Sequence, residues 1–300
     1  MAASVRARLL ANRRIGSARA LELARSEDLP AALAQLTSSP YSAGLTPDLP
    51  LEAAQRTVAA TLLWNLRLIA GWLPPGGVQA VQPLTAWFEL ANIEERIAGI
   101  SGAGHSAPYQ LGRLDVAWRA VARATTLEAV RAALASSRWG DPGDVGPEGW
   151  MAVLRLRWAA WVAASVPGAD VWAAAAGVLL AARLRFSFDP PVEASLARRL
   201  GLPPAWWETA SVPDLRARLT DRVAWVLEGI ESPSDLWRAE PRWWSRVRHD
   251  SAALFVSSRF GAGVIAGAAG LLAHDAWLTR AALAAAARGG EGRRIFDAVA

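Results

Sequence analysis

The fold class is decided by the stretch LEAAQRTVAATLLWNLRLIAGWL at residues 51–73. Its apolar residues recur at every third or fourth position, and its Glu, Gln and Arg side chains fall on other faces, which is the pattern of an amphipathic helix. Pro74, Pro75 and two glycines then end the helix. The apolar positions of this segment are Leu51, Ala54, Val58, Leu62, Leu66, Ile69 and Leu73.

Helical spacing continues through nearly the whole chain, and the alternating pattern of a β-strand is almost absent. Capping-box spacings support this, because Thr125 stands three residues before Glu128 and Ser211 three residues before Asp214. We therefore predict an all-α protein. Further helices are expected over residues 83–100, 111–124, 150–166, 171–186, 192–200, 213–229, 233–248, 251–259 and 263–287.

The composition excludes several kinds of chemistry. All 32 basic residues are Arg, and the chain of 300 residues contains neither Lys nor Cys. It therefore has no lysine for a P-loop or a Schiff base, and no thiol for a nucleophile, a disulfide or a zinc site. The three histidines, His105, His249 and His274, leave little capacity for acid–base catalysis near neutral pH. An enzyme is possible but poorly equipped, and no catalytic, cofactor-binding or metal-binding residue is assigned.

The charge pattern argues against nucleic acid as a partner. The formal net charge is only +5, and acidic residues are interleaved with arginines, whereas nucleic-acid binders cluster their basic residues. The first twenty residues contain no apolar core of a secretory signal. The longest uncharged run, residues 68–88, is broken by proline and glycine, so no transmembrane segment is expected. These features predict a soluble protein of the cytoplasm.

Two motifs could hold a ligand. Residues 261–266, GAGVIA, have the spacing of a dinucleotide-binding fingerprint, but no strand pattern surrounds them, so small residues that let helices pack closely are the favoured interpretation. The pairs His249-Asp250 and His274-Asp275 could ligate a divalent metal, as in helical metal-dependent phosphohydrolases. Solvated helix faces explain these pairs equally well.

The 16 Trp residues include two neighbouring pairs, Trp206-Trp207 and Trp243-Trp244. Tryptophans can stack on bases or sugars, but stacking platforms usually lie in a basic groove on a sheet. A role in the helical core or in a protein interface is the favoured interpretation, because both suit a large aromatic ring with one N–H group.

The sequence also contains a weak internal repeat. Residues 29–41 and 127–139 have the same apolar spacing at an offset of 98 residues, and Ser39 pairs with Ser137. Repeated helical segments of this kind indicate stacked or quasi-symmetric modules. The aligned positions are Leu29, Ala32, Leu36 and Tyr41 with Leu127, Val130, Leu134 and Trp139, and a third, partial copy has Val212, Leu215 and Leu219.

Several stretches match one known family in their order along the chain. They are residues 5–10 (VRARLL), 26–29 (SEDL), 36–41 (LTSSPY), the predicted helix 51–73, residues 87–94 (WFELANIE) and residues 260–280. Together they resemble the central-stalk adaptor of V-type and A-type ATPases, the AC39 family. The similarity is strongest over residues 5–100. It departs at the last helix, where the family's usual Glu is Asp275 and its usual Asn-Leu before Arg280 is Leu278-Thr279.

This resemblance implies three similar helical lobes around a pseudo-threefold axis, which form a funnel. We place the lobes at residues 1–104, 105–190 and 191–300. The resemblance also implies a noncatalytic adaptor that couples the central-stalk shaft to the membrane proteolipid ring during proton or sodium transport, peripheral on the inner face of the plasma membrane. Its partners would be the central-stalk subunits and the ring, with no cofactor and no nucleic acid. A metal-dependent phosphohydrolase with His-Asp ligands and a generic helical scaffold remain as alternatives.

Overall fold

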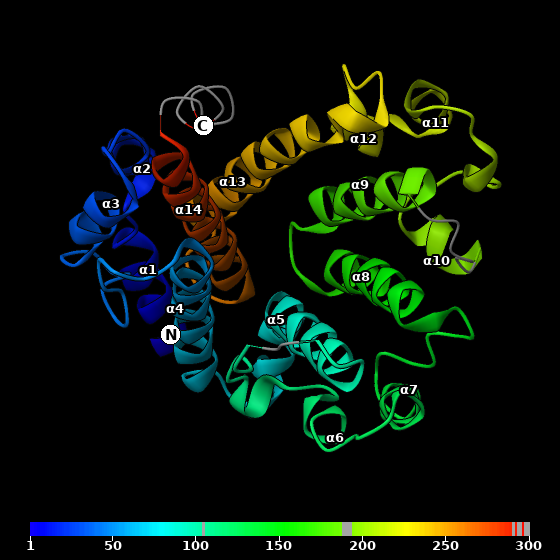
Figure 1. Ribbon diagram of the computed structural model, residues 1–300, viewed down its shortest axis with the longest axis horizontal. Coiled ribbons are helices and arrows are strands. Elements are labelled where there is room, and N and C mark those ends of the chain that lie inside the picture. The colour runs from blue at the N-terminus through cyan, green and yellow to red at the C-terminus, as the bar shows by residue number, and fades with distance from the viewer. Residues whose placement is uncertain (104–105, 188–193, 290–291, 293–295, 297–300) are drawn as a thin grey trace. The chain divides into compact units, whose positions relative to one another are not determined.

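The computed structural model describes residues 1–103, 106–187, 194–289, 292 and 296. Within these residues all regular elements are helices, which confirms the prediction of an all-α protein (Figure 1). In the same part of the chain no helix is both long enough and apolar enough to cross a bilayer. His105 and the predicted break at 189–191 lie outside the described residues.

The chain divides into two compact units. The first, here called the terminal unit, combines residues 1–75 with 244–300, and the second, the middle unit, contains residues 76–243. Helix α13 (Ala239–Ser257) begins in the middle unit and ends in the terminal unit. The division into three lobes stays a prediction.

In the terminal unit the long helix α14 packs against the four N-terminal helices (Figure 1). The apolar face of α4, predicted at residues 51–73, is buried here through Val58 and its neighbours against Leu283 of α14. Burial of such side chains is the main stabilising term of the unit. The helices are α1 (Ala2–Asn12), α2 (Gly16–Ala24), α3 (Leu29–Leu36), α4 (Leu51–Gly71) and α14 (Ala262–Arg288), with most of α13.

Small residues let α14 lie close against α13. A Cβ atom added at Gly267 would stand 2.7 Å from the backbone oxygen of Ser251 and 2.8 Å from the backbone nitrogen of Phe255, so no larger residue fits without movement. The segment 261–266 follows helix α13 rather than a strand, and Gly261 adopts a positive φ of 91° as α14 begins. Within the motif, a Cβ atom added at Gly263 would overlap the Ser258 side chain and crowd Leu254 of α13, so close packing is the role of this glycine. No strand precedes the motif in the described residues, so the dinucleotide-binding interpretation is wrong.

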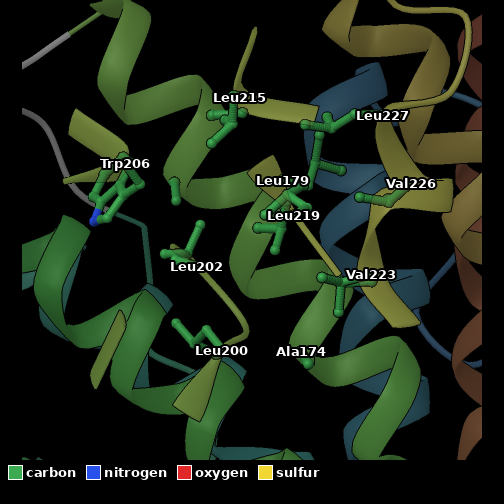
Figure 2. Close-up of a cluster of buried hydrophobic side chains, with 14 of the residues drawn as sticks. Ala174, Leu179, Leu200, Leu202, Trp206, Leu215, Leu219, Val223, Val226 and Leu227 are labelled. Atoms are coloured by element: carbon green, nitrogen blue, oxygen red, sulfur yellow. The ribbon is translucent and has the colours of Figure 1, made fainter. Parts of the chain in front are cut away.

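In the middle unit helix α8 packs against both α5 and α9 (Figure 1). One apolar cluster joins α5 to α8, and a second, around α9, contains Trp206, Leu200 and Leu215 (Figure 2). The helices of this unit are α5 (Val78–Ile100), α6 (Trp118–Val121), α7 (Leu127–Ala135), α8 (Gly146–Ser165), α9 (Asp170–Ser187), α10 (Ala194–Arg199), α11 (Val212–Arg218) and α12 (Asp221–Ala224). Short 3-10 turns cover Pro75–Gly77, Gly112–Leu114, Trp206–Glu208, Trp225–Leu227 and Pro233–Arg238.

Several predicted helix boundaries were wrong. Residues 111–124 form a 3-10 turn, an extended residue at Asp115 and the single-turn helix α6 instead of one helix. The predicted helix 213–229 is interrupted at Leu219, which is extended. Conversely, the segments 239–248 and 251–257, expected in two helices, are continuous in α13. Apolar spacing is the same in a straight and in an interrupted helix, so it does not locate such breaks.

Candidate functional site

The first copy of the sequence repeat ends in a specific hydrogen-bonded turn. Asp28 caps α3 by accepting a bond of 2.8 Å from the backbone N–H of Ala31. At the other end of the helix, the Ser39 hydroxyl donates to the carbonyl of Leu36 at 2.7 Å and accepts from the N–H of Tyr41 at 3.1 Å. This turn directs the aromatic ring of Tyr41 into the core.

The second copy has the same turn. The Ser137 hydroxyl donates to the carbonyl of Leu134 at 2.8 Å and accepts from the N–H of Trp139 at 3.1 Å, so Trp139 takes the place of Tyr41. Helix α7 is capped by Thr126, one residue after the predicted Thr125. The equivalence of residues 29–41 and 127–139 in the sequence therefore extends to their local structure.

A buried carboxylate receives the aromatic residue of the first copy. Asp275 of α14 accepts hydrogen bonds from the Tyr41 hydroxyl at 2.9 Å and from the backbone N–H groups of Gly16 at 2.8 Å and Ile15 at 3.3 Å. Because Gly16 is the first residue of α2, the carboxylate also caps that helix. Asp275 is only 3% exposed, and its acceptor positions are occupied by donors from residues 15–41.

Burial controls the ionisation of this group. It raises the pKa of Asp275 above its usual value, against the opposing effect of the Gly16, Tyr41 and Ile15 donors and of the nearby Arg14 guanidinium. The pKa of the Tyr41 hydroxyl is also raised well above its ordinary value, first by burial and then by the charge of Asp275. A Tyr that stays protonated can donate to the carboxylate at any pH in the ordinary range.

A second buried carboxylate occupies the corresponding position in the middle unit. Glu89 of α5 accepts from the backbone N–H groups of Val116 at 2.9 Å, Ala117 at 2.6 Å and Trp118 at 2.6 Å, and it therefore caps α6. Burial raises the pKa of Glu89, and the three N–H donors and the Trp139 side chain oppose this rise. The indole nitrogen of Trp139 is itself buried without a regular hydrogen-bond partner, so its effect on Glu89 comes from proximity to the carboxylate.

We call these two arrangements carboxylate junctions. In each, an acidic residue of a long helix caps a short helix and lies near the aromatic residue that ends a repeat copy, with a hydrogen bond from Tyr41 in the first. Glu89 and Asp275 are the two buried carboxylates among the described residues. The third, partial copy shares the cap, in which Ser211 accepts from the N–H of Asp214 at 3.2 Å, as predicted. The junctions fix helices relative to one another and leave no open acceptor position for a substrate or a metal.

The His-Asp pairs do not assemble a metal site in the described residues. Asp250 is bound by Arg246 at 2.8 Å, and Asp275 is held in its junction. His274 lies against the rings of Trp244 and Trp277, and burial, with two nearby arginines, lowers its pKa to about 4. In the part of the chain that is described, no three His, Asp or Glu side chains converge in a group that could hold a metal.

Of the four residues in the tryptophan pairs, one is in the core, and Trp243 and Trp244 are half-buried. Trp206 is buried, whereas its neighbour Trp207 is exposed. The Trp243 indole donates to the carbonyl of Trp172 at 2.7 Å, and Trp244 stacks on Trp277 with 5.4 Å between ring centroids.

The sequence reasoning found the aromatic and serine residues of the junctions through the repeat, but it missed Glu89 and assigned Asp275 to a possible metal pair. Comparison of the chain with protein-family models gave no match, and a search of curated proteins gave none either.

Proposed function

We propose that this chain is a noncatalytic adaptor of a rotary ATPase of the V or A type, which connects the central shaft to the membrane proteolipid ring. In this role it would lie at the cytoplasmic face of the membrane and would bind the shaft and the ring without acting on a substrate. The three-lobed arrangement with boundaries near residues 104 and 190 belongs to the same proposal.

The carboxylate junctions carry this proposal. Three central junction residues lie in stretches that resemble the adaptor family, since Tyr41 is in 36–41, Glu89 in 87–94 and Asp275 in 260–280. The Asp28 cap lies in a fourth such stretch, 26–29. A similarity produced only by helical periodicity would not select the polar residues that hold the helices together. The position of these three residues in the junctions supports the proposal.

The physical demands on such an adaptor agree with the construction of this chain. A part that transmits torque needs a stiff body and broad contact surfaces, and it needs no active site. Each junction joins helices through several hydrogen bonds to a buried carboxylate. Trp207 and Trp237 stay exposed in the middle unit, where large aromatic side chains favour protein contacts.

The test is coupling in membranes of the source organism. We expect membranes that lack the chain to lose ATP-driven ion uptake, because the head and the ring are no longer connected, and to regain it when the purified chain is added. A tagged chain should recover stalk and proteolipid subunits, identified by mass spectrometry. Ion uptake that is unchanged without the chain, or a chain recovered without those subunits, would contradict the proposal.

A matched pair of variants on α5 makes the test specific. Glu89→Ala breaks a junction, whereas Glu94→Ala removes an exposed carboxylate that binds Arg155 on the surface at 2.7 Å. Both proteins are first checked for helical content by circular dichroism. We expect the Glu94 variant to restore ion uptake as the unchanged chain does, and the Glu89 variant to restore less.

A further inference from the structure

Helix α1 has an apolar strip that the described residues of the terminal unit leave exposed. Its small residues, among them Ala3 and Ala7, are buried against the unit. On the opposite face Met1, Val5 and Leu9, each four residues after the previous one, are 85%, 58% and 51% exposed. Positions four apart lie on one side of a helix, so these three side chains form one continuous strip.

The turn between α13 and α14 extends this strip on one side. The Arg8 guanidinium donates to the carbonyl of Ser258 at 2.6 Å, and the N–H of Gly261 donates to the Ser4 hydroxyl at 3.1 Å. These bonds hold the turn beside α1. Phe260 of this turn is 45% exposed, and Val256, in the last turn of α13 just before it, is 80% exposed.

An exposed tryptophan borders the strip on the other side. Trp72 follows the last residue of α4, and the Arg6 guanidinium lies over its ring at 5.4 Å from the centroid. Trp72 is more than half exposed. We call the whole surface the α1 patch, and it consists of Met1, Val5, Leu9, Trp72, Val256 and Phe260.

Arginines adjoin the α1 patch, since Arg6 lies over Trp72 and Arg259 over Phe260. Arg6, Arg8, Arg13 and Arg259 surround it, and none of them has a carboxylate partner in the described part of the chain. The first acidic residue of the sequence is Glu22, which pairs with Arg19. An apolar strip edged by guanidinium groups that have no carboxylate partner among the described residues is complementary to a lipid surface, which has an apolar interior and anionic headgroups.

We propose that the α1 patch binds directly to the surface of a lipid bilayer that contains anionic phospholipids. Val5, Leu9, Val256 and Phe260 enter the boundary between headgroups and acyl chains, and the arginines contact the phosphates. Trp72 lies at the headgroup level, where amphipathic aromatic rings are favoured. A cationic rim around a strip of aliphatic side chains distinguishes this surface from the exposed tryptophans of the middle unit.

This contact goes beyond the adaptor proposal, because it involves lipid rather than a protein of the ATPase and belongs to the isolated chain. The test uses the purified full-length chain with vesicles of phosphatidylcholine alone or mixed with phosphatidylglycerol, separated by flotation. We expect binding to the anionic vesicles that weakens as salt is added, and little binding to the neutral ones. Vesicle binding needs no other ATPase component, so a negative result would overturn the lipid contact without affecting the adaptor proposal.

Two sets of variants assign the binding to the patch. The double variant Val5→Gln and Leu9→Gln should weaken vesicle binding roughly tenfold or more, because each side chain loses its burial in lipid. Replacing Arg13 and Arg259 by Gln should weaken it about fivefold for each charge. All four residues are exposed, so helical content measured by circular dichroism should not change.

Matched controls lie in the middle unit. Trp207→Gln with Trp237→Gln removes exposed apolar groups there, and Arg198→Gln with Arg199→Gln removes exposed charge. We expect both controls to bind vesicles as the unchanged chain does. The proposal is overturned if the chain does not float with anionic vesicles, if the Val5 and Leu9 variant binds as well as before, or if the controls weaken binding equally.

Discussion

Replacing Glu89 by Ala should destabilise the middle unit by about 3–5 kcal/mol. The substitution leaves the N–H groups of Val116, Ala117 and Trp118 without their acceptor in a buried environment. Each unsatisfied buried donor costs about 1–3 kcal/mol. Part of that cost is offset because the variant no longer buries a carboxyl group whose pKa is raised by desolvation. The net loss is therefore smaller than the sum of the three bonds.

Urea unfolding followed by circular dichroism measures this loss, and hydrogen exchange locates it. Because the chain has two compact units, unfolding is expected to show more than one transition, and only the one that belongs to residues 76–243 should shift. Amide exchange should accelerate at residues 116–118 of the variant. Glu94→Ala is the control on the same helix, and it should cost no more than about 1 kcal/mol because its ion pair with Arg155 is partly exposed.

Two results would refute the reasoning. If the Glu89 and Glu94 variants have equal stability, the buried carboxylate does not organise the unit. If the Glu89 variant is less stable but exchange at residues 116–118 is unchanged, its effect comes from a cavity and not from the loss of the α6 cap. Glu89→Gln adds a check by pH. Since the raised pKa of Glu89 makes the folded state bind the proton more tightly, this residue's contribution to stability falls as pH rises from the unfolded pKa to the folded one, and the amide should remove that slope.

Three further predictions concern the terminal unit. Tyr41→Phe should lower the unfolding free energy by about 1.5–3 kcal/mol and raise the pKa of Asp275 further, as measured by urea unfolding across acidic pH, and an unchanged pH profile would count against the bond. Between pH 6.5 and about 4, the unfolding free energy of the wild type should fall by about 2 kcal/mol more than that of His274→Phe, because the imidazole takes up a proton more readily in the unfolded chain. Equal pH dependence of the two unfolding free energies would contradict this. Gly267→Ala should cost about 1–3 kcal/mol in thermal or urea unfolding, whereas Gly71→Ala, which meets no atom within 4 Å, should be neutral or slightly stabilising.

The long helices could be predicted because each has an apolar face that repeats regularly over many turns. The segment 51–73 became α4 with the same first residue, and 263–287 became α14 within one residue at each end. In both, the buried face extends over many turns, so hydrophobic periodicity outweighs local signals. The interior position of Pro83 in α5 was not foreseen, since proline usually marks a helix start.

The predicted helix at 111–124 failed for a reason that lies elsewhere in the chain. Its residues have helical spacing, but the Glu89 carboxylate takes the N–H groups at 116–118 and so fixes a new helix start there. Glu89 stands 27 to 29 residues earlier, and no local pattern connects the two segments. The one available signal was an acidic residue at a core position of an otherwise apolar helix face.

The repeat, in contrast, was visible without a structure. Ser39 and Ser137 aligned with the same neighbours because a side chain that both accepts and donates is needed at that position of the turn. The acids that receive Tyr41 and Trp139 were hidden, since one precedes its copy in the chain and the other follows it. Aligning the two copies detects residues at the same place in each copy, and Asp275 and Glu89 lie outside the copies.

The Gly16–Asp275 contact has a consequence for synthesis on the ribosome. Its two members are 259 residues apart, so the N-terminal helices leave the exit tunnel long before the helix that covers them exists. At about 5–20 residues per second, the wait is on the order of tens of seconds. Residues 76–243 are continuous and can assemble during this time, while α1 to α4 present uncovered apolar faces. The nascent chain therefore has a long interval in which a chaperone, or a membrane near the ribosome, would compete for its first helices.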